Sequence, residues 1–271
     1  QPNAMGGREV GGLATTLAAH MDYTPHNKAC VAEFWQVDDV CDGPGFKAVD
    51  LFNAVESGEI KAVWIMATNP VVSMPDADRV KNALAKCELV VVSDCYKNTD
   101  TGALANVLLP ATGWSEKDGT VTNSERRISR QRQLVPAAGQ AKHDWWILTQ
   151  VAQRMGYGEA FAYDSPQQIF VEHAKLSGYR NNGSRAFDIS ALQHLTAQEY
   201  EQLTPVQWPL YSEKTHSVDQ PSPAKLFANN QFFTANGKAN AVAITGMPTP
   251  QQPLVGSYVL NTGRLRDQWH T

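Results

Sequence analysis

Short apolar runs alternate with amphipathic stretches in the first half of the chain. Residues 60–66, 89–92 and 107–109 are apolar almost throughout, and each run ends in polar or turn-forming residues. Between them, residues 76–86 have helical spacing and residues 100–105 have the length of a helical turn. Strands without polar alternation are typical of parallel sheets that are covered on both faces. The pattern therefore predicts an α/β fold, with a mostly parallel sheet and helices on both faces in a Rossmann-like three-layer αβα arrangement.

The rest of the chain gives a weaker pattern. Further helices are predicted at residues 13–20, 47–56, 142–155, 167–176 and 196–203. Residues 22–45 carry turn-forming residues and are predicted to be an irregular connection. Three more strands are predicted at residues 231–234, 239–244 and 257–260, and Asn236–Gly237 suggests a tight hairpin between the first two.

These elements predict three regions. Residues 1–156 form a dinucleotide-type cofactor-binding αβα domain. Residues 157–250 form a smaller mixed α+β excursion, a helical and hairpin extension of that domain. Residues 251–271 begin a β-rich last domain.

Composition excludes some classes of partner. The 271 residues carry a net charge of −4, so no broad basic field is present for nucleic acid or an anionic membrane. No apolar run approaches the length of a membrane span. The four cysteines form no Cys-x-x-Cys pair, which argues against a zinc or iron–sulfur site in this chain and favours reduced thiols. We therefore expect a cytoplasmic protein with neither nucleic acid nor membrane as a partner.

Residues 114–132 are unusually polar for their place in the pattern. They follow a predicted strand that ends at Pro110, and they include Lys117, Arg126 and Arg127 among hydroxyls and an amide. The segment is too polar for a core strand and too rich in turn formers for a helix, so we predict a loop. Ligands bind beyond the carboxyl ends of strands in α/β sheets, and fixed cations suit a phosphate-bearing ligand. A solvated loop between domains explains the composition equally well.

Polar residues also follow the other predicted strands. Asn69 can donate and accept hydrogen bonds, or it can simply cap a turn. Asp94, after Ser93, can accept from ribose hydroxyls or a guanine edge, or it can form an Asx turn. Lys117 can pair with a phosphate or face solvent, and Asp144 can cap the helix that it begins or contact a ligand.

The two arginines in the polar segment leave the same choice open. Arg126 and Arg127 can clamp an anion, or they can tie the segment to neighbouring structure through Glu125 or other acids. We favour the structural role for at least one of them. The histidines show no metal-ligand spacing.

Four segments in order resemble one family of enzymes. They are residues 1–10 (QPNAMGGREV), 64–70 (WIMATNP), 114–132 and 261–271 (NTGRLRDQWHT). Together they resemble the molybdopterin oxidoreductases that carry a bis(molybdopterin guanine dinucleotide) cofactor, most nearly the large subunits of bacterial assimilatory nitrate reductases. The resemblance implies that the chain is an internal fragment of a longer enzyme.

The resemblance also implies which residues contact the cofactor. Asn69, Lys117 and Asp144 are implied to contact the cofactor, and Ser93 and Asp94 its nucleotide end. At the pterin end the implied residues are Thr262, Gly263, Arg264 and His270. The cysteine that ligates molybdenum and the ligands of a [4Fe-4S] cluster are expected upstream of residue 1, so no catalytic residue or metal ligand is assigned here.

The implied reaction is the reduction of nitrate to nitrite at molybdenum. Its partners are nitrate and an electron-donor protein or reductase subunit, and the fragment alone is expected to be inactive. Two alternatives remain at this point. One is a fragment of a formate dehydrogenase alpha subunit, and the other is a non-catalytic nucleotide-binding or assembly module.

Overall fold

The computed structural model describes residues 3–212, 226–244, 246 and 255–258. The chain divides into two compact units, one of residues 2–224 and one of residues 225–271 together with residue 1. All helices and strands of the described residues belong to the larger unit, which contains two three-stranded sheets.

The first sheet is parallel, with its strands in chain order. β1 (Ala62–Met66), β2 (Leu89–Asp94) and β3 (Val107–Pro110) pair as β1-β2-β3, and Val92 lies opposite Leu108. β1 contains Val63 and Ile65 and β2 contains Val90, Val91 and Val92, and β-branched side chains of this kind suit a pleated, buried surface. The predicted α/β class with a parallel sheet is confirmed.

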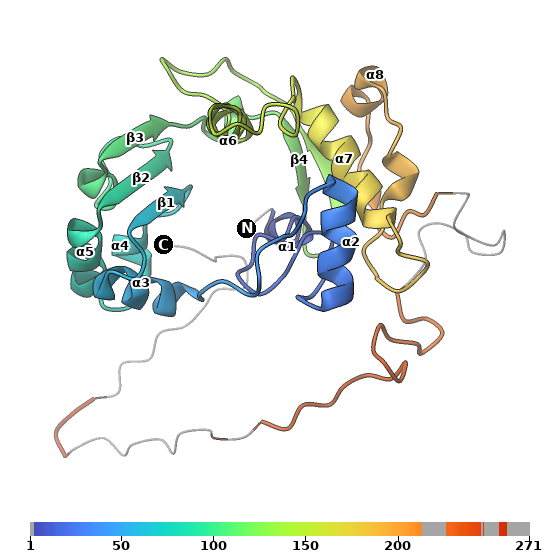
Figure 1. The fold of residues 1–271 in the computed structure, drawn as a ribbon, viewed down its shortest axis with the longest axis horizontal. Coiled ribbons are helices and arrows are strands. Elements are labelled where there is room, and N and C mark those ends of the chain that lie inside the picture. The colour runs from blue at the N-terminus through green and yellow to red at the C-terminus, as the bar shows by residue number, and fades with distance from the viewer. Residues whose placement is uncertain (1–2, 213–225, 245, 247–254, 259–271) are drawn as a thin grey trace. The chain divides into compact units, whose positions relative to one another are not determined.

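Helices pack against one face of this sheet (Figure 1). They are α3 (Ala48–Ser57), α4 (Pro70–Ser73) and α5 (Ala77–Lys86). Val90 and Val92 alternate along β2 and are buried in one cluster with Val80 and Leu84 of α5. The intervening Val91 is only half-buried. The main core of the sheet therefore lies between β2 and α5, and it fixes the strand ends where ligands bind in such folds.

The predicted polar loop is instead largely a β-hairpin. After a short 3₁₀ helix, η2 (Trp114–Glu116), β4 (Gly119–Thr122) pairs antiparallel with β5 (Arg127–Gln131). β6 (Val206–Gln207) pairs with the other side of β5. A strand in an antiparallel sheet needs apolar residues only on its core face, so mostly polar residues are compatible with a strand. Overall polarity was thus a poor reason to exclude strands from residues 114–132.

A second prediction was also wrong, because residues 22–45 contain a helix. α2 (Pro25–Trp35) begins with proline at its first position, and Thr24 Oγ1 accepts a hydrogen bond from Asn27 N at 3.2 Å. This is a strong helix start that the sequence contains. The proline was given too much weight as a breaker of regular structure, although proline is favoured at the first turn.

Three later helices agree with the predictions within a few residues, whereas the helix predicted at residues 13–20 is absent. The helices are α6 (Asp144–Arg154), α7 (Pro166–Gly178) and α8 (Ala197–Glu201), and the short 3₁₀ helices are η1 (Gly102–Leu104) and η3 (Ser190–Leu192). A further helix, α1 (Ala4–Glu9), contacts β4. No helix in the described ranges is long and apolar enough to cross a membrane.

The smaller unit contains no strand among its described residues. A turn is present there, because Gly237 N donates to Thr234 O at 3.0 Å and Gly237 has φ +66°, but it is not the predicted hairpin. The predicted strands at 231–234 and 239–244 are absent, and the one at 257–260 extends past the described residues. Strand propensity largely reflects packing against neighbours, and an isolated hairpin is marginal in water.

Candidate functional site

A cleft of about 350 Å³ opens at the carboxyl ends of the parallel strands. It is lined by Ala67, Thr68, Asn69, Ser93, Asp94, Cys95, Tyr96, Thr99, Ala111, Thr112, Lys117 and Asp144. All five residues that were predicted to contact the cofactor outside its pterin end are in this set, although they are spread over two strand ends, the polar segment and a helix start. The fold therefore brings together the described part of the predicted site.

An ion pair crosses one side of the cleft. Lys117 Nζ lies 2.6 Å from Asp144 Oδ2, and the two side chains are 29% and 27% exposed. Asp144 is the first residue of α6, where a carboxylate interacts favourably with the helix dipole. The helix N-cap is His143 and not Asp144, so the capping role considered for Asp144 is wrong.

The other oxygen of this carboxylate is buried and unsatisfied. Asp144 Oδ1 has no hydrogen-bond partner within the part of the chain that the structure describes. A buried carboxylate oxygen without a donor is costly, so native structures normally pair such atoms. Its position in the lining of the cleft indicates that a ligand with an N–H or O–H group could provide the missing donor.

Asn69 stabilises the segment after β1 through hydrogen bonds to Thr101. Its Oδ1 accepts hydrogen bonds from Thr101 Oγ1 at 2.6 Å and Thr101 N at 3.2 Å. Thr101 is fully buried and accepts from Val71 N, which joins the loop after β1 to the loop after β2. The Asn69 amide nitrogen makes no hydrogen bond to a described residue, so it keeps its donor capacity for the cleft. The turn-capping and ligand-binding interpretations of Asn69 are compatible.

The end of β2 has a similar division of roles. Ser93 is buried, and its Oγ accepts a hydrogen bond from Trp64 Nε1 at 2.8 Å. Asp94 Oδ1 accepts from Tyr96 N at 2.9 Å, which is the Asx turn considered for it. Burial, followed by the nearby Asp94 carboxylate, raises the pKa of the Cys95 thiol. Ser93 is thus primarily structural, while Asp94 remains half-exposed at the cleft.

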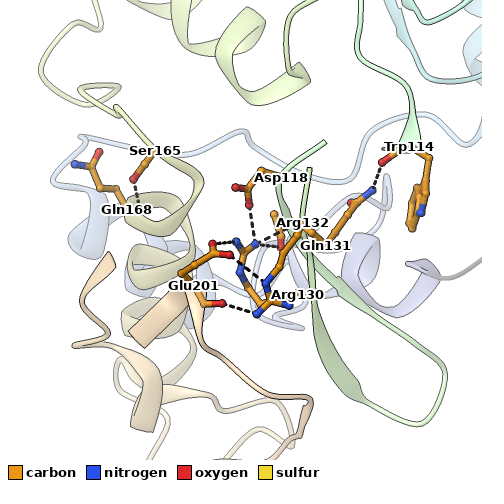
Figure 2. Close-up of polar contacts among 9 residues, drawn as sticks. Trp114, Asp118, Arg130, Gln131, Arg132, Ser165, Gln168 and Glu201 are labelled. Carbon is orange, nitrogen blue, oxygen red and sulfur yellow. Dashed lines mark hydrogen bonds and ion pairs between the residues drawn. The ribbon is translucent and has the colours of Figure 1, made fainter. Parts of the chain in front are cut away.

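The acids on either side of Lys117 are engaged elsewhere. Glu116 accepts hydrogen bonds from Gly113 N at 2.7 Å and Ala138 N at 2.8 Å. Asp118 Oδ1 accepts from Arg130 Nη1 at 2.7 Å (Figure 2). Neither acid therefore neutralises Lys117, whose charge is shared only with Asp144 among the ion pairs of the described residues. This arrangement leaves Asp144 as the acid that competes with an anionic ligand for Lys117 among the described ion pairs.

The two arginines of the hairpin turn do not line the cleft. Arg126 Nη1 donates to Trp208 O at 2.7 Å, and its guanidinium lies 5.2 Å from the centre of the Trp208 ring. Arg127 is exposed and lies 4.0 Å from Glu125. The structural role favoured for at least one of them is confirmed for Arg126.

Sequence reasoning missed several lining residues. Ala67 has φ +54°, an unusual value for a residue other than glycine, directly after β1. Thr112 is buried and its Oγ1 is hydrogen-bonded to His143 Nδ1 at 3.2 Å. Tyr96 lies two residues after Asp94 and is mostly exposed. Their positions just after strand ends were the available signal. The four residues predicted at the pterin end, Thr262, Gly263, Arg264 and His270, lie outside the described residues.

Comparison with known proteins defines the family. The sequence model of the molybdopterin oxidoreductase family matches residues 3–154. These residues include every helix and strand that lines the cleft. The chain belongs to the molybdopterin oxidoreductase family.

Individual relatives match the whole chain. A nitrate reductase of Klebsiella oxytoca is 49% identical over 275 residues, covering 100% of this chain and 30% of the relative. A formate dehydrogenase subunit alpha of Methanocaldococcus jannaschii is 31% identical, covering 100% of this chain and 37% of the relative. The chain thus spans about a third of the length of these curated relatives.

A solved structure has a similar fold. Acetylene hydratase from Pelobacter acetylenicus superposes with a TM-score of 0.51, covering 86% of this chain and 28% of that chain. The two sequences are 18% identical, so this similarity concerns the fold alone.

Proposed function

We propose that this chain supplies part of the cofactor-binding wall of a molybdenum-dependent nitrate reductase. In this proposal the cleft holds the nucleotide end of a bis(molybdopterin guanine dinucleotide). The observation that carries the proposal is the Lys117–Asp144 pair, which combines a cation with a buried acceptor that lacks a donor. The cleft volume of about 350 Å³ lies within the range of ligand sites, which is roughly 300–1,000 Å³.

Four of the lining residues have a chemistry that suits this ligand. Lys117 provides a point charge for a phosphate oxygen. Asp144 Oδ1 and the half-exposed Asp94 carboxylate can accept from ring N–H groups or ribose hydroxyls. The Asn69 amide can donate to a phosphate or a carbonyl oxygen. The cofactor, when bound, supplies the two-electron chemistry that converts nitrate and two protons to nitrite and water.

The substrate proposal rests on the relatives. The nitrate reductase is 49% identical to this chain and the formate dehydrogenase subunit alpha is 31% identical, which favours nitrate over formate. We propose that an electron-donor protein or reductase subunit delivers the electrons in the cytoplasm. The molybdenum ligand and the [4Fe-4S] ligands are proposed to lie in the whole protein outside this chain. The residues of the pterin end, Thr262, Gly263, Arg264 and His270, keep that proposed role.

The cofactor content of the purified whole protein tests this function. We expect about one molybdenum and two releasable GMP per polypeptide in the wild-type protein, the stoichiometry of a bis(guanine dinucleotide) cofactor. With the whole protein, nitrate should oxidise reduced viologen, and formate should not reduce oxidised viologen. Lys117→Ala should lower both contents. Lys97→Ala is a matched control, because Lys97 lies in the loop after β2 but does not itself line the cleft. Full loading of Lys117→Ala would contradict the proposed role of the cleft.

A further inference from the structure

A nearly buried arginine lies behind the segment that carries Lys117. The Arg130 side chain is 1% exposed, and its guanidinium donates to Asp118 Oδ1 at 2.7 Å and Glu201 Oε2 at 2.8 Å. It also donates to Gly119 O and lies 4.1 Å from the centre of the Tyr200 ring. Figure 2 shows Arg130 between Asp118 on one side and Glu201 on the other.

These contacts join two distant parts of the chain. Asp118 immediately precedes β4, whereas Tyr200 and Glu201 belong to α8. Arg130 itself is on β5, opposite Thr120 of β4. A guanidinium presents several donors in a planar fork, so one side chain can fix several acceptors in a defined geometry. Arg130 therefore fixes the start of β4 against α8.

Lys117 lies two residues before the start of β4. Lys117 and Asp118 are consecutive, and consecutive Cα atoms are about 3.8 Å apart. A shift of Asp118 must therefore move the Lys117 backbone. Such a shift would disturb the position of Lys117 Nζ, which lies 2.6 Å from Asp144 Oδ2 at the cleft. The Asp118 contact also prevents that carboxylate from competing with Asp144 for Lys117.

We propose that Arg130 is a positioning residue for Lys117 and thereby for the anionic ligand of the cleft. This inference rests on the proposed function. Arg130 does not line the cleft, so it acts through Asp118 and the backbone of Lys117. Without its guanidinium, Asp118 is free to approach Lys117, and the Lys117 charge is partly withdrawn from the ligand.

Arg132 provides a matched control. It also binds Glu201, with Nε 3.1 Å from Oε1, and it donates to the Glu201 backbone oxygen. Its side chain is 46% exposed, and no hydrogen bond or ion pair of the described residues joins it to Asp118. Loss of Arg132 thus weakens the link to α8 without releasing Asp118.

GDP binding to the whole protein, prepared without its cofactor, tests the proposal. Calorimetry should show roughly tenfold weaker GDP binding for Arg130→Gln, the loss expected when a charge-assisted contact is weakened. Arg130→Lys keeps the charge without the fork and should give an intermediate loss. Arg132→Gln should change the affinity less than twofold. In a Lys117→Ala background, Arg130→Gln should cause no further loss.

A merely structural role gives different results. The proposal is overturned if the losses of GDP affinity from Arg130→Gln and Lys117→Ala add up in the double variant. It is also overturned if Arg130→Gln and Arg132→Gln weaken GDP binding equally. If Lys117→Ala alone leaves GDP binding unchanged, the proposed function of the cleft fails, and lysine labelling then decides the positioning role by itself. Arg130→Gln should change the acetylation rate of Lys117 relative to Lys97 at least twofold, measured by mass spectrometry. An unchanged ratio overturns the positioning role whatever the cleft binds.

Discussion

Lys117 Nζ and Asp144 Oδ2 lie 2.6 Å apart, and they join the segment before β4 to the start of α6. The pair is neither fully buried nor fully exposed, so solvent screens part of its interaction. Its second carboxylate oxygen remains without a donor among the described residues. Under the proposed function, this arrangement serves ligand binding more than stability.

Asp144→Asn should therefore reduce ligand binding more than stability. A partly exposed ion pair contributes up to about 1 kcal/mol, so the free energy of unfolding should change by no more than this. The GMP content of the whole protein should fall several-fold, because a carboxylate acceptor is replaced by a weaker amide. Urea unfolding and GMP release from the same preparations give the two values. A large loss of stability with normal GMP content would show that the pair is structural.

Arg130→Ala should destabilise the protein, in contrast to Arg132→Ala. Burial lowers the Arg130 pKa, but the hydrogen bonds to Asp118 and Glu201 and the nearby charges together raise it overall. Removing a buried partner typically costs about 3–5 kcal/mol, but Asp118 and Glu201 are partly exposed, so we expect about 2 kcal/mol. Arg132→Ala should cost roughly 0.5 kcal/mol. Equal values in urea unfolding would contradict the difference in burial.

Glu9 should make stability fall as pH rises above the usual range of a carboxyl. Its carboxylate is buried and accepts hydrogen bonds from Thr122 Oγ1 and Trp208 Nε1. Burial raises its pKa, although these hydrogen bonds lower it in part. The folded state therefore holds a proton that the unfolded state releases just above pH 4.5, and stability decreases through that window.

Glu9→Gln is the test of this pH dependence. The amide has nearly the same shape and can still accept from Trp208, while its nitrogen can donate to Thr122 Oγ1. We expect the decrease in stability above pH 4.5 to disappear in the variant. The free energy of unfolding should be measured by urea titration at several pH values. An unchanged slope would mean that Glu9 ionises at the same pH in both states.

Two histidines should act in the opposite direction. Burial lowers the pKa of His173 to about 4, and burial followed by the charge of Arg8 lowers that of His20 to about 4. Unfolded histidine takes up a proton near pH 6.5, so the unfolded state binds more protons between about pH 4 and 6.5. Their contribution to stability is complete above pH 6.5 and is lost as the pH falls towards 4.

His173→Phe separates this effect from packing. The His173 ring stacks on Phe187 with centroids 5.2 Å apart, and its Nε2 has no partner among the described residues. A phenyl ring can keep the stacking without a titratable group. The loss of stability between pH 6.5 and 4 should become smaller in the variant, as measured by thermal unfolding. If the variant and the wild type lose stability equally, His173 is not the group responsible.

Much of the first sheet could be predicted from the sequence. Apolar runs such as residues 89–92 are informative because burial on a parallel sheet excludes polar residues from most positions. The ends of these runs then located Asn69 and Asp94 at the cleft. These predictions succeeded because each depends on residues that are close together in the sequence.

The β4–β5 hairpin and the contacts of Arg130 with α8 could not be predicted in the same way. Thr120 and Arg130 pair across a turn, and Arg130 is buried only because Glu201 and Tyr200 come from α8. A buried arginine looks like an exposed one in the sequence until its distant partners are known. The same applies to Glu9, whose hydrogen-bond partner Trp208 is 199 positions away.

A crystal structure of the whole protein loaded with its cofactor tests the proposed role of the cleft most directly. The distance to measure joins Lys117 Nζ to the nearest phosphate oxygen of the nucleotide. We predict a direct contact within about 3.2 Å, with a donor from the ligand satisfying Asp144 Oδ1. A nucleotide bound away from the ends of β1, β2 and β3, with Lys117 still paired only to Asp144, would contradict it.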